Sequence, residues 1–95
     1  MRKKPIKNYI RTHRLKRGFS QKEVATLLGH KSQALVSHWE KGTKIPTLEN
    51  FFKLAAILKV FPAEMLYKEL LDQTRGEILQ RKKRLNIWEE YRYPR

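Results

Sequence analysis

The chain has 95 residues, enough for one compact domain and too few for two. It contains no cysteine, which excludes disulfide bonds and thiolate metal sites. No apolar run reaches the ~18 residues of a membrane-spanning helix. The basic amino end leads into Pro5 instead of an apolar stretch, so we expect no signal peptide.

The charge of the chain is high and positive. It has 22 lysines and arginines against 9 acidic residues, a net charge of +13, and residues 1–17 contain no acid. Such a field attracts polyanions, which favours a nucleic-acid partner, with an acidic membrane surface as the next alternative. We see no paired carboxylates, no nucleophile beside a histidine and no Gly-rich phosphate loop. We therefore expect no enzyme, cofactor, metal site or small-molecule substrate.

Apolar residues recur at helical spacing, and no stretch has the pattern of a strand bounded by turns. The first predicted helix runs over about residues 8–17. Pro5 stands at its expected start, and Gly18 is placed to close its end.

A capping box marks the second predicted helix, over residues 21–28. Ser20 and Glu23 are three residues apart, the spacing at which each side chain bonds the backbone N–H of the other. Gly29 ends this helix after two turns, since glycine tolerates the positive φ of a tight turn. The inner positions of the helix are Val24, Ala25 and Leu28.

The third predicted helix runs from Gln33 to about Lys41. Ser32 is its expected cap and Gly42 its expected end. Val36 and Trp39, three residues apart, form its inner face.

Two further helices complete the prediction. Thr47 caps a fourth helix over residues 48–58, and Pro62 opens a fifth that carries Met65 and Leu66. We expect the fifth helix to continue as a long basic extension that frays after Glu90. The apolar stripe of the fourth helix consists of Leu48, Phe51, Leu54, Ala55 and Leu58.

The second and third predicted helices, joined by a tight turn at Gly29, form a candidate helix-turn-helix. In this motif the second helix is anchored from inside by apolar side chains, here Val36 and Trp39. Its opposite face must carry hydrogen-bonding groups sized for base edges. That face consists of Gln33, Ser37 and His38.

Three runs of the sequence carry a family resemblance. They are S-Q-K-E-V-A-T-L-L-G over 20–29, V-S-H-W-E-K-G over 36–42 and I-P-T-L-E over 45–49. Together they resemble the Cro/phage-repressor (XRE-type) family of helix-turn-helix regulators, over roughly residues 8–67.

The resemblance implies an all-α fold. It consists of a five-helix, repressor-like DNA-binding domain over residues 1–67 and a basic helical extension over 68–95, a possible dimer or partner surface. The stretch from Gly29 to Glu40 is one residue longer than the family pattern, with the extra residue expected within 30–33. The register of the first base contact is therefore open by one residue.

The family pattern also implies three sets of functional residues. Base contacts would come from Gln33, Ala34, Ser37 and His38, since glutamine pairs with adenine and the alanine methyl with that of thymine. Phosphate contacts would come from Gln21, Lys31, Lys41, Thr43 and Lys44. A structural ion pair would join Arg14 of the first helix to Glu40 of the third.

These features predict a sequence-specific DNA-binding transcriptional regulator, a repressor rather than an activator, located in the cytoplasm with the nucleoid. We expect a homodimer that reads two half-sites one helical turn apart. The candidate dimer surface is a loosely heptad stripe of Leu66, Leu70, Ile78, Leu85 and Trp88. Two alternatives stay open: the stripe folds back onto its own chain, or it holds a partner protein as in an antitoxin.

Overall fold

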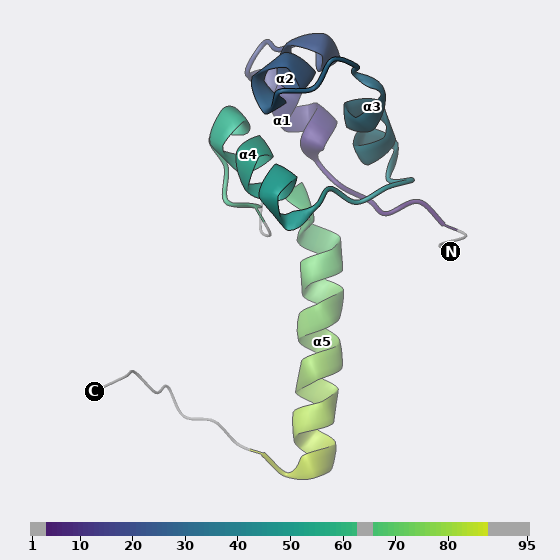
Figure 1. Cartoon of the computed structure of the whole chain (residues 1–95). Helices are drawn as coiled ribbons and strands as arrows, with labels where there is room; N and C mark the ends of the chain where they lie inside the picture. The colour runs from purple at the N-terminus through teal and green to yellow at the C-terminus, as the bar shows by residue number, and fades with distance from the viewer. Residues whose placement is uncertain (1–3, 63–65, 88–95) are drawn as a thin grey trace.

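The computed structural model describes residues 4–62 and 66–87. Within this part of the chain every regular element is a helix, as the apolar spacing predicts. The helices are α1 (Ile10–Lys16), α2 (Gln21–Leu28), α3 (Ala34–Lys41), α4 (Leu48–Leu58) and α5 (Lys68–Leu85). The first four form a bundle, and α5 stands out from it as a single rod (Figure 1).

The hydrophobic core joins these four helices to the residues just before α5. Val24 and Leu28 of α2 are buried together with Val36 and Trp39 of α3. Burial of one such aliphatic side chain stabilises a fold by about 1.5–3 kcal/mol. The inner positions predicted from helical spacing are therefore confirmed for α2 and α3.

The capping box predicted for α2 is present. The Ser20 hydroxyl accepts a hydrogen bond from the Glu23 N–H at 3.0 Å, and the Glu23 carboxylate accepts one from the Ser20 N–H at 2.9 Å. The hydrogen bonds from Ser20 hold the pKa of Glu23 below its ordinary value. Gly29 ends α2 at φ 87°, so both predicted bounds of this helix are confirmed.

The segment before α1 differs from the prediction. α1 begins at Ile10, not at Asn8, and Pro5 lies in a non-helical stretch ahead of it. The Ile6 N–H donates to the carbonyl of Gly42 at 3.0 Å, so this segment lies against the end of α3. Tyr9 has φ −119° and ψ 20° and its N–H donates to the Leu66 carbonyl, so the helix begins only after this residue.

α3 begins one residue later than predicted, at Ala34. Gln33 precedes it with near-helical dihedral angles, and its side chain makes no capping bond. Ser32 is therefore not the predicted N-cap residue, although its hydroxyl accepts a hydrogen bond from the Ala34 N–H at 3.1 Å. Gly42 ends α3 at φ 76°, as predicted.

α4 has the predicted bounds and the predicted cap, in which Thr47 accepts a hydrogen bond from the Asn50 N–H at 3.3 Å. Its stripe is less buried than predicted. Leu48 is 69% exposed, and it borders an open groove against the first turns of α5 instead of entering the core. Phe51 is half-buried, and the buried members of the stripe are Leu54, Ala55 and Leu58.

Pro62 and Leu66 have helical backbone, as predicted, but the prediction of one unbroken helix from Pro62 is wrong. α5 starts at Lys68, because Tyr67 has φ −131° and ψ 49° and its side chain is buried. The carbonyl of Leu66 accepts a hydrogen bond from the Tyr9 N–H at 2.8 Å. These contacts anchor residues 66–67 in the core and displace the helix start. Met65 lies outside the described residues.

α5 also ends earlier than predicted, at Leu85. Asn86 has φ 55°, a left-handed conformation that asparagine tolerates. The N–H groups of Asn86 and Ile87 then donate to the carbonyls of Lys83 and Lys82 and close the helix. Glu90, the predicted fraying point, lies outside the described residues.

Gly42→Ala is expected to destabilise the fold by about 3 kcal/mol or more. A Cβ at this position would lie 2.2 Å from the Ile6 carbonyl oxygen, in addition to the strain of φ 76°. Gly18→Ala is the matched control, since Gly18 has the same φ and open space around it; its expected cost is about 1–2 kcal/mol. Urea denaturation followed by circular dichroism compares the two, and equal losses would contradict the close packing at Gly42.

Candidate nucleic-acid interface

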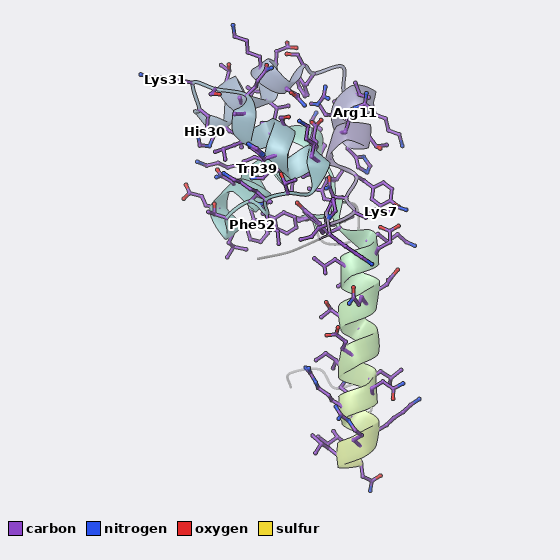
Figure 2. All side chains as sticks on the ribbon, turned by 90° about the vertical axis from the view of Figure 1, so that its right-hand side faces the viewer. Lys7, Arg11, His30, Lys31, Trp39 and Phe52 are labelled. Carbon is purple, nitrogen blue, oxygen red and sulfur yellow. The ribbon has the colours of Figure 1, made fainter. Side chains whose placement is uncertain are left out.

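α2, the turn over residues 29–33 and α3 form the predicted helix-turn-helix. Gly29 provides the left-handed residue at the start of the turn. Figure 2 shows Lys31 at the outer edge of the molecule, next to His30, and Trp39 inside the bundle. The turn therefore presents its basic residue to the surroundings while α3 is anchored from behind.

The side chains of α3 divide into an inner and an outer set. Val36 and Trp39 are 0% and 2% exposed. The residues assigned to base edges lie on the other side, where Gln33, Ala34 and His38 are exposed and Ser37 is half-buried. No element in the described part of the chain packs over this outer side, so it is accessible to a large ligand.

Three of the lysines assigned to phosphate flank α3 and are exposed. Lys31 precedes the helix, Lys41 is its last residue, and Lys44 follows in the loop. None of the three takes part in an ion pair within the described residues. Their ammonium groups are therefore available to pair with an external anion.

The two other residues assigned to phosphate are engaged within the chain. The side-chain amide of Gln21 donates to the Glu40 carboxylate at 3.0 Å. The backbone N–H and the hydroxyl of Thr43 both donate to the His38 carbonyl, at 3.1 and 3.2 Å. Neither residue has all of its donors free.

The structure brings Arg14 and Glu40 into a two-bonded ion pair between α1 and α3. The Arg14 Nε and Nη2 atoms donate to the two carboxylate oxygens at 2.5 and 3.0 Å. The Arg14 Nη1 atom donates to the Phe19 carbonyl at 2.9 Å. The side chains are only 9% and 4% exposed, and the hydrogen bond to Glu40 raises the pKa of Arg14 despite the opposing effect of burial.

Asn8 is part of this framework, and the sequence analysis did not single it out. Its side-chain amide donates to the Trp39 carbonyl at 2.9 Å and to the Ile6 carbonyl at 3.0 Å. Its side-chain oxygen accepts from the N–H of Ile10, the first residue of α1, at 3.2 Å. One side chain thus joins the start of α1 to the end of α3, where carbonyls need external donors.

Residues 4–62 and 66–87 contain no cluster of histidine, cysteine and acidic side chains suited to a metal ion. None of the helices in this part of the chain is long and apolar enough to cross a membrane. The groups that α3 and its flanking loops do expose are amides, hydroxyls, an imidazole and ammonium groups.

Comparison with known proteins agrees with this geometry. The model of the helix-turn-helix family matches residues 10–64. The chain belongs to the helix-turn-helix family. Its structure is similar to that of the restriction-modification controller protein C.AhdI from Aeromonas hydrophila, with a TM-score of 0.52 and 34% identity, over 58% of this chain and 82% of that one. No curated protein matches the sequence.

This membership confirms the XRE-type resemblance drawn from the three sequence runs, and the helices confirm the all-α fold class. The family match and the similarity to a controller protein identify the chain as a DNA-binding transcriptional regulator.

Arg14→Met is expected to lower the free energy of unfolding by about 3–5 kcal/mol, because it leaves the Glu40 carboxylate buried without its cation. The double variant Arg14→Met/Glu40→Leu should lose less than the sum of the two single variants. Lys68→Met, which breaks an exposed pair with Asp72 at 3.7 Å, should cost under about 0.5 kcal/mol. Urea denaturation measures all four variants; a loss for Arg14→Met no larger than that for Lys68→Met would contradict a structural role for the buried pair.

Proposed function

We propose that the protein is a sequence-specific repressor that acts as a homodimer in the cytoplasm, on nucleoid DNA, and reads the major groove with α3. The observation that carries this proposal is the division of α3: its inner side is buried and its outer polar side is exposed. A helix held in this way fits the width of the major groove of B-DNA.

The outer side of α3 is where we propose the base contacts. Gln33 and Ala34 stand at its amino end, the part of a recognition helix that reaches deepest into the groove. Ser37 and His38 follow about one turn later along the same side. Their amide, methyl, hydroxyl and imidazole groups are suited to hydrogen bonds and apolar contacts with base edges.

Phosphate contacts come from the residues that flank α3 on both sides. Lys31, Lys41 and Lys44 supply sequence-independent affinity, because each neutralised phosphate releases bound counterions. Gln21 remains a candidate, since an amide nitrogen has two N–H groups and Glu40 takes one of them. These contacts fix the register in which the outer side of α3 meets the bases.

The similarity to a controller protein supports a role in regulating transcription. We propose that this chain represses by occupying its operator and blocking access to the overlapping promoter. The proposed activity is binding alone, without catalysis.

We propose that a second copy of the chain docks on α5 and the groove at its base. The groove has a volume of about 380 Å³ and is lined mainly by apolar residues, which include Ile45, Leu48, Phe51 and Leu71. Ile78 and Leu85 continue this surface along α5 at intervals of seven residues and are exposed. The predicted stripe changes accordingly: Leu66 is buried in the core of its own chain, and Trp88 lies outside the described residues.

The charges along α5 favour an antiparallel pair. Its first ten residues contain three acids, Glu69, Asp72 and Glu77, against Lys68 and Arg75, a net charge of −1, whereas Arg81 to Arg84 form an uninterrupted basic run. An antiparallel arrangement sets the basic run of each copy against the slightly acidic half of the other, while a parallel one opposes the two basic runs. A two-fold axis near Ile78 would pair Leu71 of one copy with Leu85 of the other, since both lie seven residues from it.

Gln33→Ala and Lys44→Ala test the proposed mode of DNA binding. DNA selected from a random pool by the wild-type protein serves as the probe. Gln33→Ala should cost about 1–3 kcal/mol and relax the preference at one base, whereas Lys44→Ala should weaken binding to all sequences and reduce the salt slope by about one. Lys53→Ala on α4 is the charge-matched control and should change neither. The proposal fails if no motif emerges from the selection, or if Gln33→Ala leaves both affinity and preference intact.

Ile78→Asp tests the dimer surface. It places a charge in the proposed interface, so light scattering should show a monomer, and affinity for a two-half-site duplex should fall at least tenfold while single half-site binding is unchanged. Gln80→Asp, on the opposite side of α5, is the matched control and should stay dimeric. A wild-type protein that is monomeric at all concentrations tested, or that copurifies with a stoichiometric different protein seated on this surface, would overturn the proposal; the second result would favour the antitoxin-like alternative.

A further inference from the structure

The loop after α3 makes a specific contact with a residue of the recognition helix. The Thr43 hydroxyl oxygen lies 3.2 Å from Nδ1 of His38, and the same hydroxyl donates to the His38 backbone carbonyl at 3.2 Å. The Thr43 N–H donates to that carbonyl as well, at 3.1 Å. Thr43 therefore makes three hydrogen bonds with His38, and these hold the loop against the last turn of α3.

The single proton of the hydroxyl links its bond to the carbonyl with the protonation of the imidazole. A threonine hydroxyl has one proton to donate and can accept through its lone pairs. The hydroxyl oxygen lies 3.2 Å from both the His38 carbonyl and Nδ1. When its proton is donated to the carbonyl, the contact with Nδ1 is satisfied only if Nδ1 carries a proton and donates it to the hydroxyl oxygen. A neutral imidazole has a single N–H, so its Nε2 is then a hydrogen-bond acceptor.

We infer that Thr43 is a positioning residue that fixes His38 as the Nδ1–H tautomer, so that its Nε2 atom accepts a hydrogen bond from the exocyclic amino group of a base. This inference rests on the proposed function of α3. It specifies the group on the base that one residue of this helix, His38, recognises. In the major groove only cytosine N4 and adenine N6 offer such an amino group, whereas guanine and thymine present acceptors at the equivalent edge.

The inference also changes the role expected of Thr43. Its backbone N–H and its hydroxyl proton are both used on the His38 carbonyl, so it has no donor left for a phosphate. Its contribution to DNA binding then passes through the orientation of the histidine ring. In this loop, Lys44 is then the residue that contacts phosphate, because its side chain is exposed.

The first test needs no DNA and reads the tautomer directly. Nitrogen-15 spectra of the neutral imidazole distinguish the protonated nitrogen from the bare one. The wild-type protein should show the proton on Nδ1. Thr43→Val, which keeps the side-chain shape and loses the hydroxyl, should shift His38 towards a mixture of tautomers, and Thr43→Ser should restore the wild-type spectrum. A proton on Nε2 in the wild-type protein, or identical spectra for Thr43→Val, would overturn the inference.

The second test measures base preference. His38→Ala and Thr43→Val should each reduce the preference for cytosine or adenine at one shared position of the selected motif, by about tenfold. Thr43→Ser should keep that preference. The selection itself shows whether the base is cytosine or adenine; a guanine or thymine at the position lost in His38→Ala would contradict the acceptor role.

Different results would overturn the inference about His38 and the proposed function of the protein. If Gln33→Ala and Lys44→Ala behave as expected but His38→Ala and Thr43→Val leave every base preference unchanged, the inference is wrong and the proposed function stands. If none of the four substitutions affects DNA binding, the proposed function itself fails. Circular dichroism of each variant excludes unfolding as the cause of any loss.

Discussion

The buried ion pair between Arg14 and Glu40 is the interaction on which the geometry of this protein depends. It joins α1 to α3, and Gln21 adds a hydrogen bond from α2 to the same carboxylate. Removing two charges from water costs several kcal/mol, so a buried pair of this kind contributes little net stability. Its hydrogen bonds are directional, however, and they fix how three helices are oriented around one side chain of α3.

A second set of contacts acts at the carboxyl end of α3. Asn8 bonds the Trp39 carbonyl, and the backbone of Ile6 lies against Gly42, where no side chain fits between them. α3 is therefore held from inside by Trp39, from α1 by the ion pair and from the amino-terminal segment by Asn8. The outer side of the helix takes no part in these contacts. Its one side-chain hydrogen bond described above joins His38 to Thr43, so a ligand can bind there without disturbing the core.

Local sequence signals were enough for most of this fold. The Ser20–Glu23 capping box and the glycines at 29 and 42 fix helix ends through contacts within a few residues, and those ends match. The errors came from contacts between distant segments. The carbonyl of Leu66 pairs with the Tyr9 N–H, which delays α5, and Asn8 reaches across 31 residues to Trp39. The exposure of Leu48 likewise depends on where α5 leaves the bundle, and helical periodicity carries no information about that direction.

The separation of α3 into a braced inner side and a free outer side also governs how such a protein can diverge. A substitution at an exposed position such as Gln33 or Ala34 removes no buried contact, so under the proposed mode of binding a single substitution there changes the operator without unfolding the protein. Positions 8, 14, 40 and 42 offer no such freedom, because each depends on a partner elsewhere in the chain. Duplicated copies of the gene could thus acquire separate regulons while keeping one scaffold.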